Sequence, residues 1–415
     1  MNKTRKIALL SIVLNLTKVL VGPITLYFIS LKLTPEMIGF YYAFFGVIGL
    51  KMLFEAGMTN VVKVNYSHRM SDKNSLNHLF IFSFYWFLAI SIILFIFLML
   101  IGEVYFSSYT GGVDWRGPWI FLSATTSINI FLTFIDAYLD GTQKQIELKA
   151  LQLLTNLNCI ILWLALVFDY ELYSLGIMQT FSILITLFLL VCKGNQYIIF
   201  EDVKKVNFSF KKEFQLLFPL LKKVFFVWMI SYLFWNGYTL LAFKIASPDI
   251  AGKIGMTFSL AMAGYMIANS VINNQMTHIS YLVSQNNINE SLQVLYKYLL
   301  LSVIILISGY GMYFVIFHYI PGFIIFTKVM SGENTFYLFL FFIIINIFST
   351  LNNYVRAFKI EPFVFLSLYN TISVMILFYY ELKTDGIYFK MPAMAITLTM
   401  LISIFYFYKF VRAKK

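Results

Sequence analysis

The residues best suited to chemistry are charged and amide side chains that stand inside long apolar stretches. Lys18 lies well inside an apolar run that begins at Ile7. A charge at mid-membrane costs about 2.5–3.5 kcal/mol on insertion scales, so it is expected to face a cavity or a partner. At 100° per residue, the same helical face also carries Ser11, Asn15, Gly22 and Thr25. A buried lysine provides a compact positive charge suited to an anion such as a phosphate group. The sequence therefore predicts that Asn15 and Lys18 contact a ligand.

Acidic side chains stand in two further apolar stretches. Lys51, Glu55 and Thr59 follow each other at every fourth position, and residues at this spacing share a helical face. Another stretch carries a longer polar stripe: Thr125, Asn129, Thr133, Asp136 and Asp140. We interpret Lys51 and Asn129 as substrate contacts, and Glu55 and Asp136 as groups that couple transport to an ion. Two alternatives stay open: Lys51 and Glu55 could simply neutralise each other, and Asp136 and Asp140 could lie at the membrane interface.

Amide stripes recur in the second half of the chain. They comprise Asn269, Asn273 and Thr277 in one stretch, and Asn346, Thr350 and Asn353 in another. Asn273 and Asn346 are predicted substrate contacts, although such stripes can equally hold helices together through hydrogen bonds. The four histidines and the two cysteines, Cys159 and Cys192, show no metal-ligand spacing, and no nucleotide or catalytic motif occurs. We expect no metal, no cofactor and no catalytic residue.

The elements that position these residues are predicted to be membrane-spanning helices. Apolar residues make up 60% of the 415 residues and charged residues only 12%, about half the share of a soluble domain. A span needs about 20 residues. Twelve stretches qualify: 7–31, 37–64, 78–102, 117–139, 148–168, 172–192, 216–245, 251–283, 292–317, 335–357, 361–380 and 388–408. The first is longer than the apolar part of a signal peptide, so we interpret it as a retained span.

The basic residues predict the orientation of the spans. With the N-terminus inside, 20 of the 31 Lys and Arg residues fall in cytoplasmic segments, seven in outer segments and four inside spans. The positive-inside rule then places both termini in the cytoplasm and accounts for most of the net charge of +12, so no nucleic-acid partner is needed. Lys222 and Lys223 lie near the cytoplasmic surface, where their side chains can reach the interface.

An internal repeat predicts two lobes. Thr34-Pro35-Glu36 and Ser247-Pro248-Asp249 each combine a hydroxyl N-cap, a proline at the first helical position and an acid in the first turn. The two copies are 213 residues and six spans apart, so they run in the same direction through the membrane. We expect an all-α protein of about twelve spans in two six-helix lobes around a central cavity: lobe 1–192, cytoplasmic linker 193–215 and lobe 216–415.

Several local strings resemble the O-antigen flippases of the Wzx type, within the multidrug/oligosaccharidyl-lipid/polysaccharide exporter superfamily. The strings spread over the first two-thirds of the chain: Leu33-Thr34-Pro35-Glu36 with Gly39-Phe40-Tyr41-Tyr42, Phe54-Glu55-Ala56-Gly57, Asp140-Gly141, Trp163 with Leu172-Tyr173, and Ala251-Gly252-Lys253-Ile254-Gly255-Met256-Thr257. The resemblance implies a flippase, driven by an ion gradient, that moves an undecaprenyl-diphosphate-linked oligosaccharide between the leaflets of a bacterial inner membrane. Membrane lipid and other polysaccharide-assembly proteins are the further expected partners.

Two other functions remain open at this stage. A multidrug or small-solute antiporter of the same superfamily would be expected to line its cavity chiefly with acids, because its substrates are commonly cations. A membrane-embedded polysaccharide polymerase or glycosyltransferase would need a catalytic base or a metal in a sizeable loop, and the predicted outer loops are short. We therefore expect a transporter rather than an enzyme.

Overall fold

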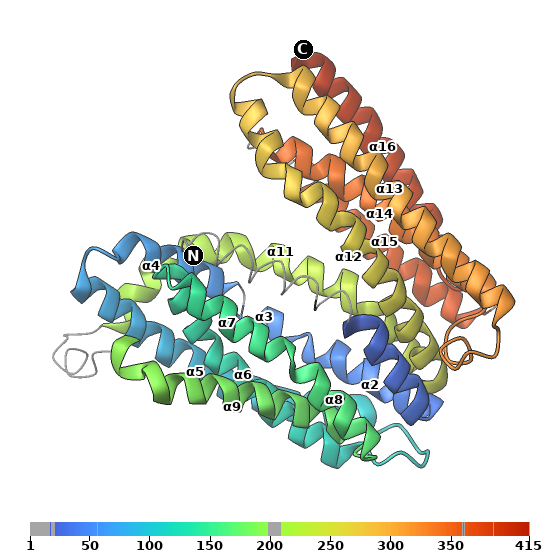
Figure 1. The fold of residues 1–415 in the computed structure, drawn as a ribbon, viewed down its shortest axis with the longest axis horizontal. Helices are drawn as coiled ribbons and strands as arrows, with labels where there is room; N and C mark the ends of the chain where they lie inside the picture. Colours follow the sequence, from blue (N-terminus) through green and yellow to red (C-terminus); the bar gives the residue numbers. More distant parts are fainter. Residues whose placement is uncertain are drawn as a thin grey trace. The chain divides into compact units, whose positions relative to one another are not determined.

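The chain is all-helical wherever the structure describes it. The computed structural model describes residues 17, 21–55, 57–197, 209–358, 360, 362–384 and 386–414 (Figure 1). Among these residues there is no strand, and ten helices are long and apolar enough to cross a membrane. The predicted fold class, an all-α polytopic membrane protein, is confirmed. The described residues of the first predicted span, 17 and 21–31, are helical, and the other eleven predicted spans are helical over most of their described length.

The chain divides into two compact units between Asn236 and Gly237. In the first unit, α6 packs against α4, α5 and α9, and α8 packs against α9. Its helices are Val21–Lys32, α2 (Pro35–Ile48), α3 (Lys51–Glu55), α4 (Met58–Arg69), α5 (Lys73–Phe106), α6 (Arg116–Gly141), α7 (Gln145–Asn156), α8 (Asn158–Val167), α9 (Tyr173–Tyr197) and the residues of α11 (Phe210–Ile245) up to Asn236. The predicted linker 193–215 stays a prediction.

The second unit is built from the end of α11 and five further helices. In it α12 packs against α13 and α14, and α16 packs against α14 and α15. The five helices are α12 (Pro248–Ser284), α13 (Ile288–Tyr319), α14 (Gly332–Arg356), α15 (Val364–Lys383) and α16 (Lys390–Lys414).

The two repeated strings begin helices, as predicted. Thr34 Oγ1 accepts a hydrogen bond from the Met37 amide at 3.3 Å at the start of α2. Ser247 Oγ accepts one from the Ile250 amide at 3.2 Å at the start of α12. In both helices a proline occupies the first turn, where its missing N–H is not needed. The same local chemistry therefore opens the second helix of each half of the chain.

Two predicted spans are interrupted, which hydropathy does not reveal. Span 37–64 is divided into α2, α3 and α4, and its second interruption includes Gly57, whose φ is 75° (Figure 1). Only glycine adopts this left-handed conformation at little cost. Span 148–168 is divided into α7 and α8 at Leu157, whose amide donates to the Leu154 carbonyl at 3.1 Å in a tight turn. The polar stripe Lys51–Glu55–Thr59 is therefore broken between Glu55 and Thr59.

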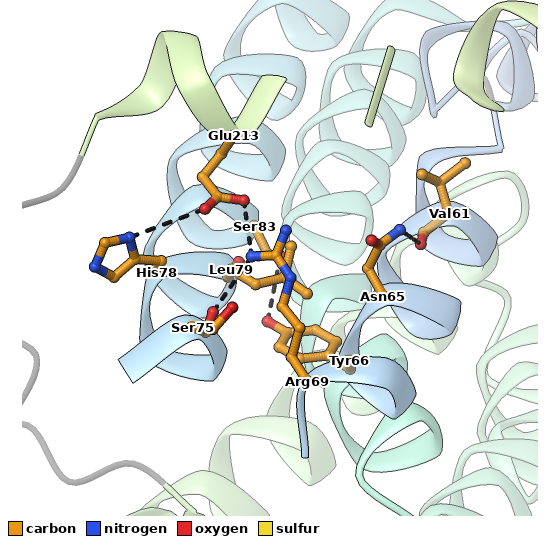
Figure 2. Close-up of polar contacts among 9 residues, drawn as sticks. All are labelled: Val61, Asn65, Tyr66, Arg69, Ser75, His78, Leu79, Ser83 and Glu213. Atoms are coloured by element: carbon orange, nitrogen blue, oxygen red, sulfur yellow. Dashed lines mark hydrogen bonds and ion pairs between the residues drawn. The ribbon is translucent and has the colours of Figure 1, made fainter. Parts of the chain in front are cut away.

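The first unit is also tied together by a mostly buried ion pair near the end of α4. Figure 2 shows the carboxylate of Glu213, at the start of α11, lying between Arg69 of α4 and His78 of α5. Arg69 Nη1 donates to Glu213 Oε2 at 2.9 Å, and His78 Nδ1 lies 3.9 Å from Glu213 Oε1. Two opposite charges that are shielded from water must lie in direct contact, because an unpaired buried charge is costly. The ion pair therefore holds the beginning of α11 against the end of α4 within the first unit.

Replacing Gly57 tests whether this interruption is built into the fold. We expect Gly57→Ala to reduce the free energy of unfolding by about 1–2 kcal/mol, because an L-residue is strained at a φ of 75°. Thermal unfolding of the purified protein in detergent measures the change. Gly22→Ala is the matched control: Gly22 is helical, and an added Cβ there meets nothing within 4 Å, so it should be neutral or slightly stabilising. Equal stability of Gly57→Ala and wild type would contradict the left-handed conformation at Gly57 as the cause of the interruption.

Candidate functional site: a polar cavity in the first unit

The polar stripe of α6 faces a cavity of about 310 Å³. Asn129, Thr133 and Asp136 line it, at the spacing of four and three residues that places side chains on one helical face. Part of the stripe on the fourth predicted span therefore lines a hollow within the first unit, while the predicted roles of Asn129 and Asp136 stay predictions. Thr133 Oγ1 donates to the Ile130 carbonyl at 2.6 Å, so the threonine satisfies its own helix while its oxygen remains able to accept.

The short helix α3 brings two charged side chains to the same cavity. Lys51 and Glu55 both line it, whereas Thr59 lies in α4, beyond the interruption. In the part of the chain that the structure describes, Lys51 and Glu55 are not within ion-pair distance of each other or of any other charged group. The two side chains therefore form no direct ion pair, although their opposite charges lie close enough to interact electrostatically. Mutual neutralisation and the predicted roles in substrate contact and ion coupling all stay predictions.

Three helices that the sequence analysis did not single out complete the cavity. Gln152 and Thr155 come from α7, Asn158 from the start of α8, and Gln179 from α9. The signal was present in the sequence, because residues 152, 155 and 158 are spaced by three and residues 179, 182 and 186 by three and four. The same stripe test, applied to the spans 148–168 and 172–192, would have found them. Each stripe is short and uncharged, so it stood out less than the acids did.

Hydrogen bonds hold two of the amides in fixed orientations. Gln179 Oε1 accepts from Thr125 Oγ1 at 3.1 Å and from Thr126 Oγ1 at 2.9 Å. Its Nε2 is thereby left as a donor. Asn129 Nδ2 donates to the Thr125 carbonyl at 3.1 Å and to the Gln179 carbonyl at 3.5 Å, which leaves Oδ1 as an acceptor. The cavity therefore presents both a donor and an acceptor on side chains that cannot easily reorient.

Asn158 is the most unusual of the lining residues. Its side chain is buried, with 8% of the residue exposed, and its Oδ1 has no hydrogen-bond partner among the described residues. A buried polar atom without a partner costs roughly 1–3 kcal/mol. It lies directly after the α7–α8 interruption, at the cavity wall. Such an atom is expected to be retained where a ligand or water completes its bonding.

The two acids of α6 have different surroundings. Asp140 forms an ion pair with Lys63 of α4, and its Oδ1 accepts from Gln145 Nε2 at 2.6 Å. Asp136, one turn earlier, lines the cavity and forms no ion pair with the described residues. Asp140 therefore serves the packing of α4, α6 and α7, while the charge of Asp136 is available to the cavity.

The remaining predicted site residues lie elsewhere. Asn346 is fully buried in the second unit, and its Nδ2 donates to Ser302 Oγ of α13 at 2.8 Å, a contact between two helices. Asn273 is exposed on α12 of the second unit. Neither lines the cavity. Asn15 and Lys18 fall outside the described residues, so their predicted roles stay predictions.

The lining chemistry limits what the cavity can hold. Eleven of its fifteen lining residues are polar, and none of these described residues is aromatic. Lys51 offers one positive charge against the two carboxylates of Glu55 and Asp136. No group of three or more His, Cys, Asp or Glu residues within the described ranges could hold a metal ion. Amides and hydroxyls at fixed positions are suited to sugar hydroxyls, and the two carboxylates are suited to protons or small cations.

Comparison with solved structures shows which fold this is. The inward-facing conformation of a multidrug resistance MATE family transporter of the MOP superfamily is similar at a TM-score of 0.73 and 14% identity, covering 97% of this chain and 95% of that one. The lipid II flippase MurJ, in an inward closed conformation, is similar at a TM-score of 0.64 and 18% identity, covering 98% and 87%. No protein-family model and no curated protein sequence matches the chain. The chain therefore has the fold of these membrane transporters over nearly its whole length.

Substituting the two acids of α6 separately tests their different surroundings. We expect Asp136→Asn to leave the free energy of unfolding unchanged or higher, because it removes a charge that lacks an ion-pair partner. Asp140→Asn should lower it by about 1 kcal/mol or less, because the pair with Lys63 is partly exposed. Thermal unfolding in detergent gives both values. A greater loss of stability for Asp136→Asn than for Asp140→Asn would mean that Asp136 has a structural partner after all.

Proposed function

We propose that the protein is a flippase for a lipid-linked oligosaccharide, with the cavity of the first unit receiving part of the polar head group. The proposed substrate is an undecaprenyl-diphosphate-linked oligosaccharide, an O-antigen repeat unit. It would move from the cytoplasmic to the periplasmic leaflet of a bacterial inner membrane, with both termini of the protein in the cytoplasm. Other polysaccharide-assembly proteins are the expected partners.

The polarity of the cavity carries this proposal. A hollow between membrane-spanning helices that is lined by amides, hydroxyls and acids is costly unless its contents use those groups. Sugar hydroxyls both donate and accept, and the cavity offers a donor at Gln179 Nε2 and acceptors at Asn129 Oδ1 and Asn158 Oδ1. A fold shared with a lipid II flippase is consistent with a substrate of this kind.

The charged groups divide into two proposed roles. Lys51, and Lys18 as predicted from the sequence, would supply counter-charge for the diphosphate, because an anion needs compensation in a region of low dielectric constant. Glu55 and Asp136 would take up the coupling ion, since both line the cavity without an ion-pair partner among the described residues. Asn273 and Asn346 belong to the second unit, and a role for them in substrate contact rests on the sequence alone.

Multidrug export is the second candidate, and it is supported by the similarity to a multidrug MATE transporter at a TM-score of 0.73. Its usual substrates are lipophilic cations, which favour apolar and aromatic walls. The described lining of the cavity has two acids against one lysine, which suits a cation and supports this second candidate. The described lining has no aromatic residue and is rich in amides and hydroxyls, which favours a carbohydrate over an aromatic cation.

Transport by the purified protein in liposomes distinguishes the two candidates. We expect a fluorescent lipid-linked oligosaccharide to become accessible to a membrane-impermeant glycosidase only when the protein is present, and faster under a proton gradient. Glu55→Gln and Asp136→Asn should abolish the acceleration by the gradient, because they remove the groups that take up the ion.

The controls in this assay are a cationic dye and the Asp140→Asn variant. Asp140 is ion-paired to Lys63, so its substitution should leave the response to the gradient in place. Accumulation of the cationic dye, together with an unchanged distribution of the lipid-linked oligosaccharide, would contradict the flippase and support the multidrug transporter.

A further inference from the structure

A second hollow, apolar and of about 360 Å³, lies between α7 and α9 of the first unit. Leu154 of α7 and Leu184, Phe188 and Cys192 of α9 are among the residues that line it. Their side chains are largely exposed; for Phe188 the exposed fraction is 70%. Exposed apolar residues are ordinary on a membrane helix, so exposure alone indicates nothing. The hollow needs a more specific explanation only because of where it lies.

The apolar hollow and the polar cavity are lined by neighbouring residues on both helices. On α7, Thr155 lines the polar cavity and Leu154 lines the apolar hollow. On α9, Thr186 lines the polar cavity and Ile185 lines the apolar hollow. One helical pair therefore presents a polar surface and an apolar surface that are one residue apart on each helix. This is the arrangement that an amphiphile requires, with a polar end beside a hydrocarbon chain.

We propose that the α7–α9 groove, lined by Leu154, Leu184, Ile185, Phe188, Leu189 and Cys192, holds the first part of the substrate's hydrocarbon chain while its polar end occupies the polar cavity on the same two helices. This assignment rests on the proposed function, and it adds a location for the hydrocarbon chain of the substrate. Lipid tails are as apolar as leucine, so the groove gains little by transfer of the chain out of the bilayer. Its contribution is positional: it holds the chain so that the first sugar residues meet Asn158 and Gln179.

The reactivity of Cys192 can report whether the groove is occupied, because Cys192 is exposed in the groove and the other cysteine, Cys159, is buried. The experiment measures alkylation of Cys192 by a maleimide in the full-length protein in nanodiscs, with Cys192→Ser as the background control. The ligands are a prenyl-diphosphate-linked disaccharide, the prenyl phosphate without sugar, and the disaccharide diphosphate without a prenyl chain. At ten times its Kd, a ligand leaves roughly a tenth of the protein free, so alkylation should slow about tenfold with the complete amphiphile.

Two variants make the test specific. Ile185→Trp fills the groove and should remove the protection of Cys192, whereas Val191→Trp, on the same helix at an 85% exposed position outside the groove, should not. If the prenyl phosphate alone protects Cys192 as well as the complete amphiphile does, the groove accepts any lipid chain. If the disaccharide diphosphate without a prenyl chain protects Cys192 equally well, the hydrocarbon chain is not involved. Either result overturns the assignment.

The failure of this assignment can be distinguished from the failure of the proposed function. If wild-type protein translocates the lipid-linked oligosaccharide in liposomes but Cys192 reacts at the same rate with and without the complete amphiphile, the groove assignment is wrong and the flippase stands. If the protein translocates no lipid-linked saccharide, the proposed function fails whatever the labelling shows.

Discussion

Backbone hydrogen bonding is the constraint on which the rest of this structure depends. In hydrocarbon, an unpaired N–H or C=O group costs several kcal/mol, so a span must be helical wherever lipid surrounds it. A helix can be interrupted only where protein or a water-filled cavity provides new partners. In the described part of the first unit, predicted spans are interrupted at Gly49–Leu50, at a point that includes Gly57, and at Leu157. The helices next to these interruptions line the polar cavity: α3 contributes Lys51 and Glu55, and α8 begins with Asn158.

The same constraint gives the described polar groups two kinds of surroundings. Arg69 with Glu213, and Lys63 with Asp140, are matched charges that join helices of the first unit. Asn346 makes a comparable link between α13 and α14 through Ser302. Asp136 and Asn158 differ, because both line the cavity, and the described residues give neither an ion pair to the first nor a hydrogen bond to the Oδ1 atom of the second. The Oδ1 atom of Asn346 also lacks a partner among the described residues, but Asn346 does not line this cavity.

Hydropathy and cap chemistry were sufficient to predict the helices. Long apolar stretches have few alternatives to a helix in a bilayer, and the caps at Thr34 and Ser247 use short-range hydrogen bonds that are visible in the sequence. The interruption at Gly57 could not be predicted in this way. Glycine is common in spans, and the left-handed conformation that breaks this one depends on tertiary packing.

The candidate site was predictable in part. The stripe from Asn129 to Asp136 was recognised because an acid in a span is rare and its neighbours repeat at helical spacing. Asn346 shows the limit of that reasoning: a stripe that joins helices and a stripe that lines a cavity have the same spacing, and only the structure gives its contact with Ser302. Gln179 and Asn158 carry no charge, so they did not stand out in the sequence.

The most direct test of the account is the affinity of the protein for the head group when Asn158 is replaced by leucine. Asn158→Leu keeps the size of the side chain and removes an oxygen that has no partner among the described residues, so the fold should be retained. The affinity for a lipid-linked oligosaccharide should fall about tenfold, the value of one hydrogen bond of about 1.4 kcal/mol. Asn156→Leu, two residues earlier and outside the cavity lining, should bind like wild type. Equal affinities for wild type and Asn158→Leu would contradict the claim that this cavity receives the sugar.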